Sequence, residues 1–226
     1  MKDFRYEIKF VLNENMLFEY LQLAKTISAY NKYPNRIVQS LYFDTINFDN
    51  IKDNLSGISN RNKLRLRWYS ESSDSPVLEI KNREGRVGNK NKFIIEDITT
   101  KDLEFISCGE LKNKLFYYMN AKFPKENVFN KLYLPVIKVN YNREYLQTNS
   151  GIRLTLDKNI CFKNISLNRP IEHFKETEYK TYILEIKFSF EMKKQVSEIL
   201  RQFRLTPQRH SKYLTGMSKL GYSSYI

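Results

Sequence analysis

The 226-residue chain carries 38 Lys and Arg against 25 Asp and Glu, a formal charge of +13, which predicts an anionic partner. Its 16 Tyr and 15 Phe, with only 7 Gly and 6 Pro, exclude a disordered or low-complexity chain. Two cysteines at unrelated positions exclude a disulfide scaffold. The sequence has no apolar run long enough to span a membrane, and its N-terminus lacks the pattern of a signal peptide. We therefore expect one cytoplasmic domain over residues 1–226, with no transmembrane segment.

Alternating apolar and polar residues predict most of the secondary structure. From the N-terminus we expect a strand at 4–12, a helix at 13–28 capped by Asn13, a strand at 37–44 and a short polar segment at 47–55. Next come strands at 63–69 and 77–81, a flexible basic loop at 82–92, a return strand at 93–98 and a helix at 99–130. After residue 130 the pattern predicts strands at 136–146, at 152–156, near 160 and at 182–188. It also predicts helices at 191–201 and 211–220. The pattern indicates an α+β domain of about eight strands.

Charged residues occupy one face of several predicted strands. The triplet Glu-Ile-Lys occurs at 7–9, 79–81 and 185–187, and the segments 63–67 and 153–157 alternate Lys, Arg or Asp with Leu in the same way. Because residues i and i+2 of a strand share a face, each of these strands has one charged face and one aliphatic face. A half-exposed sheet explains one such strand, whereas five favour a barrel with a charged interior and helices outside.

Cations that line such a channel need a polyanion, because unpaired buried charge is costly. A triphosphate or polyphosphate chain meets that need, since its oxygens accept contacts from Arg and Lys. The Glu residues of the same strands can pair with cations or hold a divalent metal. Glu14 and Glu19 on the first predicted helix argue against a nucleic-acid face there, and the basic excess instead falls at 61–69 and 201–213.

Eight motifs in order resemble the VTC domain, the polyphosphate-polymerase branch of the triphosphate tunnel metalloenzymes. They begin at Arg5 (RYEIK), Ser40 (SLYFD), Leu64 (LRLRWY), Leu78 (LEIK), Tyr141 (YNR), Ile152 (IRLTLD), Leu184 (LEIK) and Ser211 (SKY). The resemblance implies an antiparallel eight-stranded β-barrel with flanking helices, forming a hydrophilic tunnel. It also implies transfer of the γ-phosphoryl group of ATP to a growing polyphosphate chain with Mn²⁺ or Mg²⁺.

The same resemblance implies roles for particular residues. The phosphate-binding cations would be Lys9, Arg65, Arg67, Lys81, Arg143, Arg153 and Lys187, with Arg209, Ser211 and Lys212 closing one end of the site. Arg65, Arg67 and Lys212 would be catalytic, Glu185 would hold the metal, and Tyr141 would lie near the nucleotide. A further basic residue falls at Lys90 or Lys92, and we prefer Lys92 slightly.

Three functions fit these residues: a polyphosphate polymerase, a metal-dependent triphosphate or polyphosphate hydrolase, and a non-catalytic module that binds polyphosphate or nucleic acid. ATP, polyphosphate and triphosphate are the expected partners, and the eukaryotic members leave a membrane-protein partner open. Arg5 stands where the related cyclase and thiamine-triphosphatase branch has a Glu, which removes one metal ligand. His173 and His210 lack metal-ligand spacing, and Gly85 and Gly88 predict a hairpin loop rather than a nucleotide-binding loop.

Overall fold

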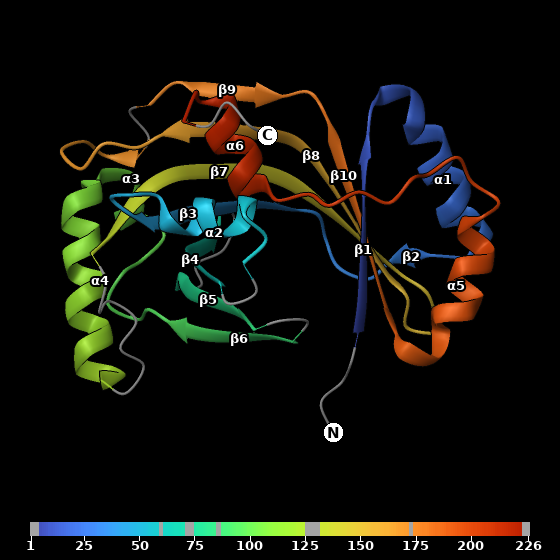
Figure 1. The fold of residues 1–226 in the computed structure, drawn as a ribbon, viewed down its shortest axis with the longest axis horizontal. Coiled ribbons are helices and arrows are strands. Elements are labelled where there is room, and N and C mark those ends of the chain that lie inside the picture. The colour runs from blue at the N-terminus through green and yellow to red at the C-terminus, as the bar shows by residue number, and fades with distance from the viewer. Residues whose placement is uncertain are drawn as a thin grey trace. The chain divides into compact units, whose positions relative to one another are not determined.

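The structure, a computed structural model, describes residues 5–58, 61–70, 75–84, 87–124, 132–171 and 174–222. Its strands are β1 (Arg5–Leu12), β2 (Tyr30–Asn31), β3 (Arg36–Thr45), β4 (Arg61–Tyr69), β5 (Val77–Glu84), β6 (Val87–Ile94), β7 (Tyr133–Gln147), β8 (Arg153–Asn164), β9 (Glu176–Tyr179) and β10 (Tyr182–Ser189). Its α-helices are α1 (Leu17–Thr26), α2 (Asp49–Leu55), α3 (Asp102–Phe105), α4 (Cys108–Lys122), α5 (Lys193–Leu200) and α6 (Lys212–Lys219), and 3-10 turns at Glu14–Met16 and Phe190–Met192 precede α1 and α5 (Figure 1).

The strands of the described residues form a sheet in the order β1-β10-β8-β7-β3-β4-β5-β6, with β2 paired to β7 and β9 paired to β8. The pairs whose register is known are antiparallel. This confirms the predicted α+β class and its antiparallel sheet, although the order runs from β1 to β6 without closing, so the sheet is an open form of the expected barrel. No helix in the described ranges has both the length and the apolarity to cross a membrane.

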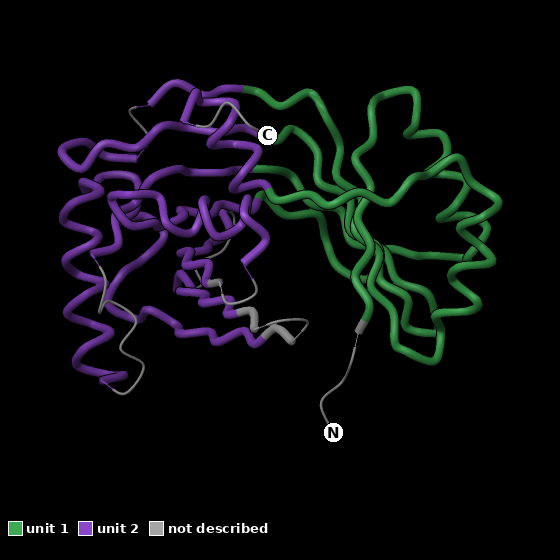
Figure 2. Tube along the Cα trace, viewed as in Figure 1, with its two compact units in different colours: residues 1–37, 141–160, 178–211 green, residues 38–140, 161–177, 212–226 purple. Residues whose placement is uncertain are grey.

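The chain folds into two compact units (Figure 2). Unit 1 comprises residues 1–37, 141–160 and 178–211, and unit 2 comprises residues 38–140, 161–177 and 212–226. The long strands β7 and β8 contribute residues to both units.

Unit 1 packs apolar side chains of β1, β8 and β10 against helices α1 and α5. Phe10, Leu154 and Ile186 are among the buried strand residues, and they belong to one core cluster with Leu23 of α1 and Val196 of α5. The register pairs Ile186 with Ile8 and Leu154, so apolar side chains share one face. Glu7, Lys9, Glu185 and Lys187 then lie on the other face, as the alternation predicts.

Unit 2 repeats this division on β3, β4, β5 and β6. Leu41, Leu66 and Leu78 are fully buried and belong to one core cluster with Leu111 and Leu115 of α4. Ser107 caps α4, because its hydroxyl accepts a hydrogen bond from the Glu110 N–H at 3.2 Å. In both units the aliphatic face of the sheet therefore lies under helices, and the charged face is turned away from that core.

The segment expected to be a flexible basic loop is a β-hairpin. Strand β5 continues to Glu84 and β6 begins at Val87, with Asn82 opposite Asn89 and Lys81 opposite Lys90. Gly, Asn and Lys have low strand propensity, which misled the prediction, and pairing with β5 overrides that propensity. The return strand consequently ends at Ile94, earlier than expected.

Other elements differ in extent. The helix expected at 13–28 is a 3-10 turn followed by α1, with the Asn13 side chain accepting from the Met16 N–H at 3.1 Å. The helix expected at 99–130 is divided into α3 and α4, and residues 125–131 lie outside the described residues. The polar segment 47–55 contains α2, while β2 and β9 are too short and too polar to stand out in the sequence.

Candidate functional site

A basic face lies on strands β3 to β6 of unit 2. Arg65 of β4 is directly opposite Tyr42 of β3 and Glu79 of β5, and Glu79 is opposite Lys92 of β6, so these four side chains share a face. The charged and polar side chains of this face, which we call the basic face, are Ser40, Tyr42, Asp44, Lys63, Arg65, Arg67, Glu79, Lys81, Lys90 and Lys92. Six cations therefore face two carboxyl groups among the described side chains.

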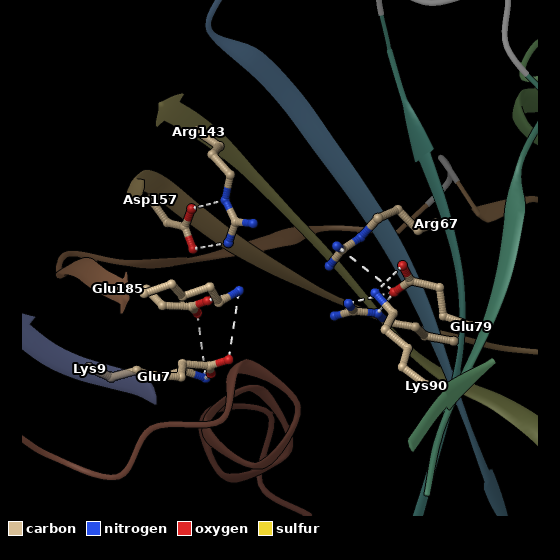
Figure 3. A network of polar contacts seen from close by, with 10 residues as sticks. Glu7, Lys9, Arg67, Glu79, Lys90, Arg143, Asp157 and Glu185 are labelled. Carbon is tan, nitrogen blue, oxygen red and sulfur yellow. Dashed lines mark hydrogen bonds and ion pairs between the residues drawn. The ribbon is translucent and has the colours of Figure 1, made fainter. Parts of the chain in front are cut away.

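Glu79 is the buried centre of the basic face (Figure 3). Its Oε2 accepts from Arg65 Nε at 2.6 Å and lies 2.5 Å from Arg65 NH2, while Arg67 NH1 is 3.9 Å away. Its Oε1 lies 2.5 Å from Lys90 Nζ. Burial alone would raise the pKa of Glu79, but Arg65, Arg67 and Lys90 outweigh burial and lower it to about 2. Glu79 is thus ionised throughout the neutral range and orients the cations around it.

Lys90 has a low pKa for a lysine. Burial and the nearby Arg65 and Arg67 guanidinium groups lower the pKa of Lys90 to about 8, although Glu79 opposes that change. Lys90 Nζ makes the ion pair with Glu79, and Lys92 lies on the same face, exposed and directly opposite Glu79. Both residues that the sequence proposed for this position therefore belong to the basic face.

Two tyrosines that sequence reasoning did not select connect the basic face to α6. The Tyr42 hydroxyl accepts from Arg65 NH1 at 3.1 Å, and the Tyr42 ring stacks on Tyr213 with centroids 5.1 Å apart and planes at 12°. The Tyr213 hydroxyl donates to Asp44 Oδ2 at 2.5 Å, and Asp44 Oδ1 accepts from the Thr45 and Asn50 N–H groups. The alternation of Tyr42 with apolar Leu41 and Phe43 is the signal that could have placed it on the charged face.

The charged face of unit 1 holds carboxylates and lysines in alternation (Figure 3). Lys9 Nζ lies 3.0 Å from Glu7 Oε1 and 3.7 Å from Glu185 Oε2, and Lys187 pairs with both carboxylates. Burial would raise the pKa of Glu185, but Lys187, Lys9 and Arg143 lower it to about 2. Burial and Glu185 would raise the pKa of Glu7, which Lys9 and Lys187 nevertheless lower. Lys9, Glu185 and Lys187, all predicted site residues, are thus brought together.

Arg143 of β7 forms a two-pronged ion pair with buried Asp157 of β8. Its Nε donates to Asp157 Oδ1 at 2.5 Å and its NH2 donates to Oδ2 at 2.8 Å. The guanidinium lies 5.1 Å from the Tyr141 ring centroid. Burial would lower the pKa of Arg143, and Tyr141, Asp157 and Glu185 raise it instead, so Arg143 stays charged. The predicted cation is therefore already paired within the protein.

The remaining predicted residues are dispersed over both units. Arg153 of β8 is exposed and directly opposite Lys187, and Arg209 is exposed in the segment before α6. Lys81 is exposed on the basic face, Ser211 is half-buried, and Lys212 is the first residue of α6, one residue before Tyr213. His210 stacks on Tyr179, whereas His173, Gly85 and the Arg5 and Gly88 side chains lie outside the described residues.

A model of one known protein family matches nearly the whole chain. The VTC domain model matches residues 4–221. The chain belongs to the VTC domain family. Vacuolar transporter chaperone complex subunit 2 of Saccharomyces cerevisiae is 24% identical over 243 residues, an alignment that covers 80% of the chain. This VTC domain spans about 28% of the length of that yeast protein.

Solved structures share the fold of the VTC domain. A putative adenylyl cyclase from Hippeastrum, described as having a dominant triphosphatase activity, superposes with a TM-score of 0.52 at 17% identity, covering 95% of this chain and 96% of its own. The PH1012 protein of Pyrococcus horikoshii has a TM-score of 0.54 at 13% identity, covering 93% of this chain and 99% of its own. At these identities the likeness shows the fold alone, and it confirms the predicted fold class.

Oxygen donors on the charged face of unit 1 suit a hard divalent cation. The described residues contain no group of three or more His, Cys, Asp and Glu that could hold a metal by themselves. Glu7 and Glu185 nevertheless converge on Lys9 and Lys187, and the Thr155 hydroxyl, opposite Glu185 on β8, is buried without a hydrogen-bond partner in the described part of the chain. Mg²⁺ commonly uses one or two carboxylates and takes its other ligands from water and phosphate oxygens. The donor set of this VTC domain therefore fits such an ion.

Proposed function

We propose that this VTC domain is a polyphosphate polymerase, which transfers the γ-phosphoryl group of ATP to a growing inorganic polyphosphate chain. Membership of the VTC domain family supports this proposal. The observation that carries it is the basic face, on which six Lys and Arg residues share one side of the sheet with two carboxyl groups, Glu79 and Asp44, among the described side chains. An excess of cations gathered on one sheet face favours a ligand with several adjacent negative charges.

The proposed reaction requires positioning and charge stabilisation rather than a covalent nucleophile. Arg65 and Arg67 would contact the oxygens of the transferred phosphoryl group, with Glu79 orienting the Arg65 guanidinium through the 2.6 Å hydrogen bond. Lys212, which lowers the pKa of nearby Tyr42, would add positive charge from α6. Lys81, Lys90 and Lys92 would bind the further phosphates of the chain.

The charged face of unit 1 offers the proposed ligands of a divalent ion. Glu185, with Glu7 and the Thr155 hydroxyl, would hold Mn²⁺ or Mg²⁺, and the ion would supply positive charge that stabilises a bound phosphate. Lys9 and Lys187 would then pair with phosphate rather than with these carboxylates. Arg143, Arg153 and Arg209 are proposed as further phosphate-binding residues, Ser211 as a hydroxyl ligand, and Tyr141 as a contact of the nucleotide.

Incubation of the purified protein with ATP and Mn²⁺ tests the proposal. Long-chain polyphosphate, resolved on a gel and degraded by exopolyphosphatase, is the expected product. Arg65→Gln should abolish its formation, whereas Lys114→Gln on the exposed surface of α4 should not change it. Release of inorganic phosphate alone would overturn the polymerase in favour of a triphosphate hydrolase, the activity described for the Hippeastrum protein. Binding of polyphosphate without turnover would overturn any enzymatic role.

The proposed location is the cytoplasm. Neither Cys108 nor Cys161 is in a disulfide, the state that a reducing compartment maintains. The yeast relative is named as a subunit of a complex, which supports a search for a membrane-protein partner of this chain. Co-purification of the tagged full chain from its native cells would test for such a partner.

A further inference from the structure

Tyr42 is a buried tyrosine whose hydroxyl lies among cations. Only 7% of the residue is exposed, and Arg65 NH1 donates to the hydroxyl at 3.1 Å. The charges of Arg65, Arg67 and Lys212 act on this hydroxyl more strongly than any carboxylate does. Glu79 is engaged by Arg65 and Lys90, and Asp44 is engaged by Tyr213 and two backbone N–H groups.

The hydroxyl therefore has a proton to donate and no acceptor for it. A tyrosine hydroxyl both accepts and donates, whereas Arg and Lys can only donate. Across the described residues, the hydroxyl's hydrogen bond is the one it accepts from Arg65, and no acceptor lies within reach of its own proton. A buried donor without an acceptor is costly, and an anion that arrives at the surrounding cations would supply the missing acceptor.

We propose that Tyr42 is a further substrate-contacting residue, whose hydroxyl donates a hydrogen bond to a phosphate oxygen held by Arg65 and Arg67. The inference deepens the proposed function and rests on it, because it requires that the basic face bind a chain of phosphates. The Tyr42 hydroxyl would add one directional hydrogen bond to those that the surrounding Arg and Lys side chains can donate to the same phosphate.

The surroundings of Tyr42 hold the hydroxyl in place before the ligand binds. Its ring stacks on Tyr213, whose own hydroxyl is anchored to Asp44 at 2.5 Å. The groups that face Tyr42 are Arg65 and Arg67 of β4, Lys212 and Tyr213 of α6, and Asp44 of its own strand. Burial would raise the pKa of Tyr42, and the three cations lower it, which shows how strongly the site favours negative charge at that oxygen.

Calorimetric titration with inorganic triphosphate tests the proposal without requiring turnover. Tyr42→Phe keeps the ring and its stacking but removes the hydroxyl, so we expect the dissociation constant to rise about tenfold or more. Tyr118→Phe is the matched control, because Tyr118 is equally buried in unit 2 but donates to the Ile94 carbonyl at 3.0 Å, away from the basic face. The control should bind as the unaltered protein does. Unchanged binding by Tyr42→Phe would overturn the inference.

A spectroscopic titration of the unaltered protein covers the case in which Tyr42→Phe does not fold. If bound triphosphate accepts a hydrogen bond from the Tyr42 hydroxyl, it should raise the pKa of one tyrosine. The phenolate absorbance of that tyrosine should then appear at higher pH in the presence of triphosphate. The Tyr118→Phe protein should show the same change. Triphosphate binding with no such change would overturn the role of Tyr42 and leave the proposed function standing. Absence of triphosphate binding by the unaltered protein would overturn both. Binding of triphosphate without polymerase activity would overturn the proposed reaction but not the role of Tyr42 in binding.

Discussion

At the scale of single residues, the basic face combines cations of permanent and of adjustable charge. Arg65 and Arg67 supply guanidinium groups, a type of side chain that is not deprotonated in proteins. Lys90, with its pKa lowered to about 8 by burial and the two arginines, carries a full charge only on the acidic side of that value. The face therefore loses positive charge as the pH rises above neutrality, and the loss occurs beside Glu79.

Lys90→Arg should remove part of the pH dependence of triphosphate binding. The affinity of the unaltered protein should fall between pH 7 and pH 9, across the pKa of about 8, as Lys90 releases its proton. Arginine keeps its charge in that range, so the fall should be smaller in Lys90→Arg. Dissociation constants for triphosphate at pH 7, 8 and 9 measure the difference.

Lys114→Arg on α4 is the control, since Lys114 pairs with Glu110 on the helix surface and not with the basic face. Its pH profile should match that of the unaltered protein. Equal slopes for all three proteins would contradict a titrating Lys90 in the binding site.

The sequence predicts which cations share the basic face far better than it predicts the partners of those cations. Alternation in 63–67 and 79–81 suffices to put Arg65, Arg67 and Glu79 on one side of two strands. The Tyr213–Asp44 hydrogen bond joins residues 169 positions apart, and no local pattern carries such a contact. Tyr42 was overlooked for the same reason, since its role depends on which cations the strand pairing brings to it.

At the scale of elements, α6 depends on a glycine for its place against the sheet. A Cβ at Gly216 would lie 2.5 Å from Ile137 Cδ1 and 2.6 Å from Phe162 Cδ1, and both of these side chains are fully buried. The absence of a side chain thus lets α6 approach β7 and β8 closely. Because Lys212 and Tyr213 belong to the first turn of α6, the same close packing sets their positions.

Gly216→Ala should destabilise the protein and weaken triphosphate binding together. Alanine in place of glycine would by itself favour the helix by about 1 kcal/mol, but overpacking costs about 1–3 kcal/mol. We expect a net loss in the free energy of unfolding, measured by urea denaturation, and a higher dissociation constant for triphosphate. Thr215→Ala, in the same helix, is the control and should leave binding unchanged. A more stable Gly216→Ala protein would show that α6 can move away at no cost.

Strands with a strong local sequence pattern were predicted well. Strands that form only because they pair with a neighbouring strand were not. Strands β1, β4 and β10 alternate sharply and lie within a residue or two of their expected bounds. Strand β6 is rich in Asn, Gly and Lys, and it exists because β5 supplies a template of backbone hydrogen bonds. The two-residue strand β2 depends in the same way on its pairing with β7.

At the scale of the whole molecule, the charged faces of the two units differ in balance. Among the described side chains, the basic face of unit 2 has six cations and two carboxyl groups, whereas the charged face of unit 1 has Lys9, Arg143, Arg153 and Lys187 beside Glu7, Asp157 and Glu185. An excess of cations favours anion binding, whereas paired charges such as Arg143 and Asp157 also stabilise the fold of their own unit. Loss of charge on the basic face should therefore affect mainly binding, and loss of a paired charge in unit 1 should also lower stability.

Arg65→Gln and Asp157→Asn test this division of roles. Glu79 keeps Arg67 and Lys90 when Arg65 is removed, so unfolding free energy should change by about 1 kcal/mol while triphosphate affinity falls about tenfold or more. Asp157→Asn leaves the Arg143 charge without its carboxylate and should cost about 3 kcal/mol. Urea denaturation and calorimetry measure both variants, with Glu198→Gln on the surface of α5 as the control. Unfolding caused by Arg65→Gln would place Arg65 in the structural framework instead.

The strict alternation of Leu64, Leu66 and Trp68 with Lys63, Arg65 and Arg67 makes β4 intolerant of any change in length. Deleting or inserting a single residue would exchange the two faces of the strand, sending guanidinium groups under α4 and leucines to the basic face. Such a change would disrupt both the proposed phosphate site and the packing of the core. Natural variation in this strand should consequently be confined to substitutions, with gaps and additions accumulating outside it.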